Sequence, residues 1–324
     1  MNRRAFLRAV SVSGFAALTM PGCERANSAL RIASHHWPGY EFLFLAQREG
    51  WISPQDALLV ETGSATESIE LIASHRADGA ALTLDELLRA REQGLALTAV
   101  LVFDISVGAD VLLAKPGIET LLQLKGKRIG FEASALGALM LHKALEAAGL
   151  QLAEVKTVSV TLDRHLEAWH AGNIDALITF EPISSQLQAE DARRLFDSSM
   201  IPDTIFDVLV VSPAALERHR DALRRLIAAH FQGLANFRKN PYDSAYRMAE
   251  SFKLKPKEVI GTFKGLELPN ESRNRKLLRG EDAIVVKTAS ELGRIMRQAH
   301  ILKSSQTSLY GLASADFIPR DPGR

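Results

Sequence analysis

Acidic side chains recur where predicted strands end, and two aromatic side chains stand beside the first such end. In the stretch "HHWPGYEF", a Pro-Gly turn follows the apolar run "LRIAS" and carries Trp37 and Tyr40. Their ring faces could stack on a flat ring or attract a cation, which is worth roughly 0.5–2 kcal/mol for each ring. The alternative is that both rings only cover the end of a hydrophobic core. The acids at strand ends or on crossing segments are Asp85, Asp104, Asp110, Glu132, Glu181 and Asp207.

Each acid also has a simple structural explanation. Asp85 precedes "ELLRA" and is expected to cap that helix, because a side-chain oxygen there accepts an unpaired backbone N–H. Asp104 and Asp207 could hold a hinge through backbone N–H groups. Carboxylates gathered in one cleft, however, repel one another unless a cation, a hydrogen-bond donor or a proton compensates. None of these stretches carries Lys or Arg in the same position, so we expect a cationic ligand or a neutral one rich in nitrogen.

Two predicted helix starts favour the opposite charge. The stretches "GSATES" and "EASALG" would present unpaired N–H groups and the positive end of a helix dipole, which attract anions. In the second stretch, Glu132 occupies the position that the anion would take, and Coulomb repulsion opposes it. The charge pattern as a whole therefore disfavours an anionic ligand.

The elements that position these residues follow a βα pattern. From Leu30 onward, short β-rich runs alternate with helical stretches, which predicts an α/β fold with largely parallel sheets. Two strand-like segments, 97–110 and 204–213, flank a self-contained block of βα units, so we expect two lobes joined by two crossing strands. Such a hinge permits closure around a ligand at the carboxyl ends of the strands. The predicted division is 30–106 plus 212–312 for the first lobe and 107–211 for the second.

Composition excludes several functions. A chain of 324 residues is long enough for two lobes, and its net charge of +1 gives no reason to expect nucleic-acid binding. No P-loop, nucleophile elbow or zinc-protease motif is present, so we expect no cofactor and no catalysis. His35 and His36 are neighbours on a predicted strand and would point to opposite faces, so we expect no metal site. His165 and His170 are expected to lie on the surface.

The N-terminus differs from the rest of the chain. Residues 1–22 carry Arg3-Arg4 and a short apolar segment, which resembles a twin-arginine export signal. "MPGC" resembles a bacterial lipobox, and Cys23 is the only Cys in the chain. We expect lipidation of Cys23, which would anchor the exported protein to a membrane through a tether at 23–29. The alternative is an incidental thiol in a cleaved signal.

Four stretches in this order resemble a known family: "WPGYE", "DISVGADVLLAKPGI", "LKGKRIGFE" and "DALITFEP". Together they are similar to the solute-binding lipoproteins of ABC importers, of the nitrate/sulfonate/taurine group that includes binders of the thiamin pyrimidine precursor. The resemblance covers residues from about 30 to 270. It implies a two-lobed periplasmic-binding-protein-like (type II) fold, with two doubly wound sheets and a small-molecule ligand held between the lobes.

The resemblance also implies a set of ligand-binding residues and partners. In this family pattern, Ser106, Gly108 and Asp110 lie at the crossing, and the protein hands its ligand to an ABC permease and ATPase. The acid-rich set departs from the hydroxyls, backbone N–H groups and basic residues expected of oxyanion binders, which disfavours nitrate and alkylsulfonates. The Cys-rich motif of the pyrimidine-synthesising relatives is absent, and we expect a monomer that binds no nucleic acid. A sensory lipoprotein with the same fold remains the alternative function. The remaining implied site residues are Trp37, Tyr40 and Thr83 in one lobe, and Glu132, Ser134 and Glu181 in the other.

Overall fold

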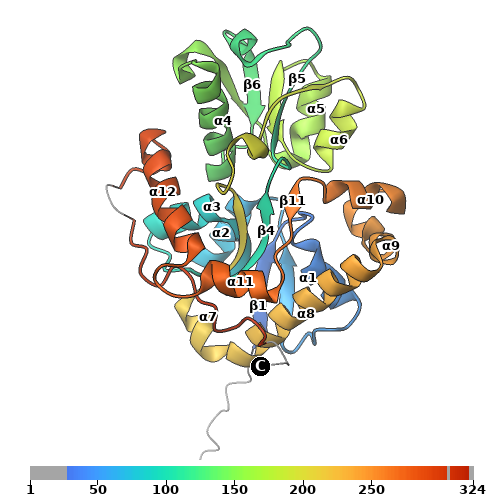
Figure 1. Ribbon diagram of the computed structural model, residues 1–324, viewed down its shortest axis with the longest axis vertical. Coiled ribbons are helices and arrows are strands. Elements are labelled where there is room, and N and C mark those ends of the chain that lie inside the picture. The colour runs from blue at the N-terminus through green and yellow to red at the C-terminus, as the bar shows by residue number, and fades with distance from the viewer. Residues whose placement is uncertain (1–27, 305–306, 321–324) are drawn as a thin grey trace, which may run out of the picture.

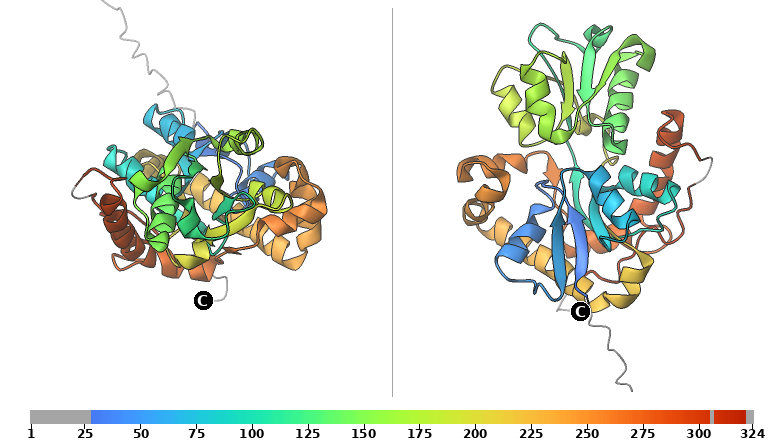
Figure 2. Two further views of the ribbon diagram at one scale, coloured as in Figure 1. Left: turned by 90° about the horizontal axis from the view of Figure 1, so that it is seen from above. Right: turned by 180° about the vertical axis from the view of Figure 1, so that it is seen from behind.

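Two lobes, each built on its own sheet, lie one above the other (Figure 1). They are joined at a narrow waist, by which we mean the crossing segments 97–110 and 204–213 where the chain passes between the lobes. The structure is a computed structural model and describes residues 28–304 and 307–320. The view from behind shows the same division, with helices covering the faces of both sheets (Figure 2). The α/β fold class with two lobes joined by crossing strands is confirmed. The predicted export signal, and Cys23 with most of its tether, lie outside the described residues.

Lobe 1 is the part built on a six-stranded sheet in the order β11-β4-β10-β3-β1-β2. Strands β1 and β2 are parallel, as are β1 and β3, whereas β10 is antiparallel to both of its neighbours. The first helices of lobe 1 come before the chain crosses to lobe 2, and its remaining helices come after the chain returns. The strands are β1 (Leu30–Ser34), β2 (Ala57–Glu61), β3 (Gly79–Thr83), β4 (Thr98–Ser106), β10 (Phe206–Val211) and β11 (Leu266–Glu267). The helices are α1 (Glu41–Arg48), α2 (Ala65–Ala73), α3 (Leu84–Glu92), α7 (Pro213–Arg218), α8 (Arg220–Lys239), α9 (Pro241–Phe252), α10 (Pro256–Thr262), α11 (Glu271–Leu278) and α12 (Ile284–Gln298).

Lobe 2 is built on a five-stranded sheet in the order β7-β6-β8-β5-β9. Strand β5 runs antiparallel to β8 and β9, while β6 is parallel to β7 and β8. Buried side chains of β5 alternate between two small cores, one on each face of the sheet, as strand geometry requires. The elements are β5 (Val111–Ala114), β6 (Arg128–Phe131), β7 (Lys156–Ser159), β8 (Ala176–Thr179), β9 (Arg193–Asp197), α4 (Ala135–Ala148), α5 (His165–His170) and α6 (Ile183–Gln188).

The waist changes two of the sequence expectations. Strand β4 leads out of lobe 1 and β10 leads back, and the two pair antiparallel, so lobe 1 has a mixed sheet rather than the largely parallel one expected. Strand β10 also pairs with β3, which places residues 206–211 in the first sheet instead of the second lobe. In the paired register Asp207 lies opposite Asp104, so both acids sit on crossing strands.

An Arg–Asp pair fixes the strand ends farthest from the cleft in each lobe. Arg31 donates from its backbone N–H, Nε and Nη2 to the carboxylate of Asp78, at 2.9, 3.0 and 2.9 Å. Arg128 makes the same three hydrogen bonds to Asp175, at 2.8, 3.1 and 2.7 Å. Each Asp lies directly before the neighbouring parallel strand, β3 or β8. The same Arg–Asp arrangement therefore holds two parallel strands together in each lobe. Among the described helices, none is long and apolar enough to cross a membrane.

Candidate functional site

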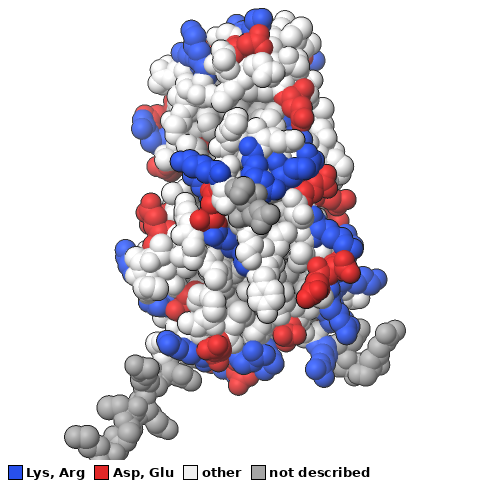
Figure 3. Space-filling model, turned by 90° about the vertical axis from the view of Figure 1, so that its left-hand side faces the viewer, with Lys and Arg blue, Asp and Glu red and all other residues white. Residues whose placement is uncertain are grey.

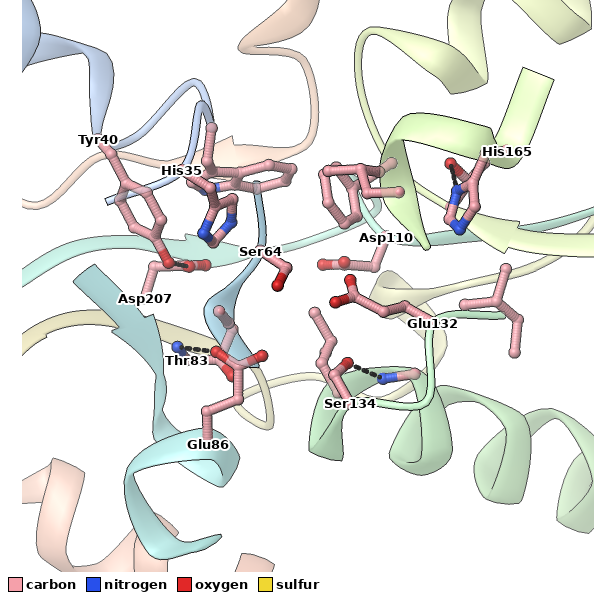
Figure 4. Close-up of a pocket in the computed structure, with 18 residues that line it drawn as sticks. His35, Tyr40, Ser64, Thr83, Glu86, Asp110, Glu132, Ser134, His165 and Asp207 are labelled. Carbon is pink, nitrogen blue, oxygen red and sulfur yellow. Dashed lines mark hydrogen bonds between the residues drawn. The ribbon is translucent and has the colours of Figure 1, made fainter. Parts of the chain in front are cut away.

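A cavity of about 40 Å³ lies between the lobes, which is room for roughly three water-sized groups (Figure 4). Elements of both lobes and the crossing segments line it. In the part of the chain that the structure describes, its walls contain several acids and two His residues but neither Lys nor Arg. The polar and aromatic side chains that line it include His35, Trp37, Tyr40, Ser64, Thr83, Glu86, Asp110, Glu132, Ser134, His165, Thr179 and Asp207.

The loop after β1 is fastened to both crossing strands. Trp37 Nε1 donates to Asp104 Oδ2 at 3.0 Å, and the Tyr40 hydroxyl donates to Asp207 Oδ1. Both aromatic side chains are buried, with exposed fractions of 4% and 1%. The two sequence interpretations therefore apply together: these rings belong to the core and also form a wall of the cavity.

Gly39 in this loop is required by space. Its φ is not positive, in contrast to the left-handed conformation that a Pro-Gly turn suggests. A Cβ added at Gly39 would overlap the Asp104 carboxylate, so only glycine lets the loop approach β4 this closely. The turn thus places Trp37 within hydrogen-bonding distance of the waist.

Trp37 also reaches the other lobe. Phe180, which directly follows β8 in lobe 2, meets the Trp37 ring edge to face with a centroid distance of 5.0 Å and an angle of 90°. This is a favourable aromatic geometry. Trp37 therefore contacts lobe 2 while it is hydrogen-bonded to the waist.

Among the described residues, the two acids of the waist, Asp104 and Asp207, are buried without a basic partner. Burial raises the pKa of Asp104 to about 7, against the opposing effect of hydrogen bonds from Trp37 and Asp207. Burial, and then the charge of Asp104, raise the pKa of Asp207 well above its usual value. Since neighbouring carboxyls cannot both ionise at low cost, Asp207 holds a proton beside Asp104.

Three further acids converge on the cavity from different parts of the chain. Asp110 Oδ2 is buried without a partner in the described residues, and burial raises the pKa of this carboxyl to about 6. Glu132, in the loop after β6, is partly buried, and its pKa is raised to about 7 by burial and then by the charge of Glu86. Glu86 Oε2 accepts the Thr83 backbone N–H at 2.9 Å, and burial raises the pKa of Glu86.

Two residues of the expected binding set do not line the cavity. Glu181 accepts hydrogen bonds from the hydroxyls of Ser184 and Ser185 at the start of α6, so it fixes a turn in lobe 2. Ser106 Oγ lies 2.7 Å from Ser198 Oγ and accepts the Asp110 backbone N–H, which makes it a contact of the waist. Six of the expected binding residues do line the cavity: Trp37, Tyr40, Thr83, Asp110, Glu132 and Ser134.

The predicted cap of α3 is wrong. Thr83 is the N-cap residue, and Asp85 lies within the helix, fully buried and outside the cavity lining. Burial raises the pKa of Asp85 well above its usual value, which favours the neutral form of this carboxyl. The residue that reaches the cavity is Glu86, which the sequence could have revealed, because Thr83 and Glu86 have the spacing of a capping box.

Two His residues also line the cavity. His165 was expected on the surface, but it is 1% exposed and its Nδ1 lies 3.1 Å from Thr179 Oγ1. Burial lowers the pKa values of His35 and His165 to about 4, so both rings are neutral near pH 7 and add no positive charge. Within the described residues, no group of three or more His, Cys, Asp or Glu side chains is arranged to hold a metal ion.

The chain is similar in sequence to a known family and to a curated protein. The family model described as "NMT1/THI5 like" matches residues 37–244. A curated protein of Brucella abortus (strain 2308), named "Putative binding protein", is 25% identical over 185 residues. That match covers 55% of each protein, so the chain spans about half the length of this curated relative.

Solved structures share the fold at low sequence identity. The alkanesulfonate-binding protein SsuA from Xanthomonas axonopodis pv. citri, bound to MOPS, superposes with a TM-score of 0.73 at 18% identity, covering 88% of this chain and 98% of that one. The desulfurization enzyme DszB superposes with a TM-score of 0.63 at 15% identity, covering 89% of this chain and 97% of that one. The likeness establishes a fold that serves both a binding protein and an enzyme.

Proposed function

The chain belongs to the NMT1/THI5-like family, and we propose that it is the extracytoplasmic solute-binding component of an ABC importer. In this role it captures a small organic ligand between its lobes and delivers it to a permease. The ligand contains nitrogen and is cationic, or neutral with several N–H donors. The protein binds this ligand without transforming it.

The observation that carries this proposal is the set of carboxyl groups around the cavity. Acids from lobe 1, the waist and lobe 2 meet there, and no Lys or Arg of the described residues lines the same cavity. The Asp110 Oδ2 atom is buried and unpartnered in the described part of the chain. A buried acceptor without a donor costs about 1–3 kcal/mol, which a ligand N–H would recover.

Aromatic and hydroxyl groups complete the proposed site. Because the polar atoms of Trp37 and Tyr40 are bound to waist acids, these residues offer the ligand their ring faces. Asp110 and Glu132 accept hydrogen bonds from the ligand's N–H groups. Ser106 and Glu181 do not contact the ligand but hold the waist and a turn of lobe 2 in place. Thr83 and Ser134 contribute cavity-facing positions at the starts of α3 and α4.

A second candidate ligand class, sulfonate or nitrate, is favoured by one observation. Ser64 and Ser134 cap the N-termini of α2 and α4, and both residues line the cavity from opposite lobes. Helix N-termini attract anions. Acids that remain protonated would permit such a ligand, and SsuA binds alkanesulfonates in the same fold.

A thermal-shift screen of residues 24–324 separates the two ligand classes. The panel contrasts amines and pyrimidines with taurine, alkylsulfonates and nitrate. A ligand at a hundredfold excess over its dissociation constant stabilises the protein by about 2.7 kcal/mol, which is readily measured. Shifts with amines or pyrimidines support the acid-lined site, and shifts with sulfonates or nitrate alone contradict it.

Two further experiments test the partners and the location. Co-purification with a permease and ATPase supports import, whereas recovery of a receptor or kinase supports the sensory alternative. Mass spectrometry of the full-length protein expressed in bacteria tests the proposed lipid anchor at Cys23. Unmodified Cys23 in the membrane-associated protein would contradict the anchor.

A further inference from the structure

Glu86 and Glu132 face each other across the cleft from opposite lobes (Figure 4). Glu86 lies in the first turn of α3 in lobe 1, and Glu132 lies in the loop between β6 and α4 in lobe 2. Glu86 is 4% exposed and Glu132 is partly buried. The charge of Glu86 acts on Glu132 in this arrangement.

No positive charge compensates the pair. Glu86 accepts one backbone N–H from Thr83, but within residues 28–304 and 307–320 the Glu132 carboxylate has no hydrogen-bond or ion-pair partner. The other titratable groups around the pair either add negative charge or are neutral near pH 7. They are Asp85 on α3, Asp110 beyond β4, Asp207 on β10 beside Tyr40, Asp163 before α5, and the neutral rings of His35 and His165.

This arrangement is confined to the cleft. On the outer face in Figure 3, Lys and Arg side chains are interspersed with Asp and Glu, and several lie near the level of the waist. On the outer surface, Arg and Lys side chains form ion pairs with several acids, as Arg193 does with Glu119 and Lys125 with Glu154. The shortage of basic groups is therefore a local feature of the cavity.

Closing the lobes brings two like charges together in a region of low dielectric. Their repulsion grows as water leaves, because Coulomb energy rises as the effective dielectric constant falls. A proton on either carboxyl, or a positive or N–H-donating group between them, removes the repulsion. Closure of the empty protein and closure around a ligand therefore respond to the same pair.

Resting on the solute-binding function proposed above, we propose that Glu86 and Glu132 determine which ligands close the lobes. A ligand that places a cationic or N–H-donating group between the two carboxylates closes the cleft, and a ligand without one leaves it open. Glu86 is thereby a specificity-determining residue on lobe 1, matched with Glu132 on lobe 2.

The proposal makes a prediction for the protein without ligand. Burial raises the pKa of Glu86, and the pKa of Glu132 is about 7. Glu132 is therefore protonated in the closed form as the pH falls below about 6, which removes the repulsion with Glu86, so acid favours closure. The closed form is lost as the pH rises through about 7, because Glu132 then ionises opposite Glu86.

The test measures the distance between the lobes in the empty protein from pH 5 to pH 8.5. Cys23 is the only Cys, so a Cys23→Ser background accepts spin labels at two introduced positions. Leu122 in lobe 2 and Tyr242 in lobe 1 are suitable, with exposed fractions of 63% and 74%. We expect the distance to lengthen as the pH rises through about 7.

The variants Glu86→Gln and Glu132→Gln are expected to stay closed at pH 8 and to lose most of the pH response. Glu70→Gln, at an exposed acid of α2, is the matched control and should behave as the parent protein. A parent protein whose lobe distance does not change with pH, or Gln variants that open as it does, would overturn the proposal.

The outcome is separable from that of the proposed function. If the distance responds as expected but no amine or pyrimidine stabilises the protein, the ligand class is wrong and the pair still controls closure. If such ligands bind and the Gln variants open like the parent, the solute-binding function stands and the role of the pair is refuted.

Discussion

In lobe 1, Arg31 and Asp78 tie β1 to β3 by the same three hydrogen bonds through which Arg128 and Asp175 tie β6 to β8 in lobe 2. In both lobes the Asp follows the Arg by 47 residues. At the opposite ends of these strands the lobes diverge. Strand β1 leads into the aromatic loop that is bound to the waist, whereas β6 leads into Glu132, whose carboxylate has no partner in the described residues.

This difference distinguishes the strand ends that hold each sheet together from the strand ends that form the candidate site. The ends far from the cleft repeat one solution for holding two parallel strands in register. The cleft ends are specialised: lobe 1 contributes buried groups already hydrogen-bonded to waist acids, and lobe 2 contributes a free acceptor. We infer that the aromatic loop of lobe 1 is the preorganised wall and that Glu132 of lobe 2, opposite Glu86 of lobe 1, supplies charge that responds to the ligand.

The largest effect is expected at Trp37, which joins the preorganised wall to lobe 2. Trp37→Ala removes a buried ring and leaves Asp104 without its donor, so we expect a loss of about 3–5 kcal/mol in unfolding free energy. Urea denaturation measures this loss. Near-parental stability with abolished ligand binding would instead make Trp37 a ligand contact without a core role.

A second variant tests the close approach of the loop to β4. Gly39→Ala forces a Cβ against the Asp104 carboxylate, and we expect destabilisation by about 1–3 kcal/mol. Gly63→Ala is the control, because its nearest neighbouring atom would lie 3.5 Å from the added Cβ. Adding Asp104→Ala to Gly39→Ala should recover part of the loss, and a failure to recover would refute the steric explanation.

Because the same Arg–Asp arrangement occurs in both lobes, we expect its removal to lower the stability of the protein by a similar amount in each. Asp78→Ala and Asp175→Ala each remove a partly exposed bidentate pair, and we expect each to cost about 1–2 kcal/mol. Thermal unfolding of the two variants measures the losses. Unequal losses, with one variant at the parental melting temperature, would show that the two pairs do not play the same part.

The smallest effect is expected from the pH dependence of stability that one Arg–Asp pair contributes. The Arg128 guanidinium lowers the pKa of Asp175 to about 2, below its value in an unfolded chain. This contribution is complete above about pH 4 and is lost as the pH falls toward 2. In acid titrations, Asp175→Ala should therefore lose less stability than the parent between pH 5 and pH 2. Parallel curves would contradict this.

The sequence predicted the two-lobed α/β fold because hydrophobic periodicity and strand-end residues are local signals. It did not reveal the Arg–Asp repeat, since the two residues are far apart in the chain and only the paired register brings them together. Glu181 follows a strand as Glu132 does, yet local hydroxyls bind it, and only coordinates distinguish the two. Glu86 had a readable capping-box signal, but its approach to Glu132 depends on how the lobes meet.

The central claim is that an acid-lined cleft selects a nitrogen-containing ligand, and the most direct measurement is ligand affinity at pH 6 and at pH 8. Asp110 and Glu132, with pKa values of about 6 and about 7, ionise across this range. Calorimetric titration of each ligand that gives a thermal shift should therefore show several-fold tighter binding of amines or pyrimidines at pH 8. A sulfonate or nitrate that binds in their place, more tightly at pH 6, would contradict the account.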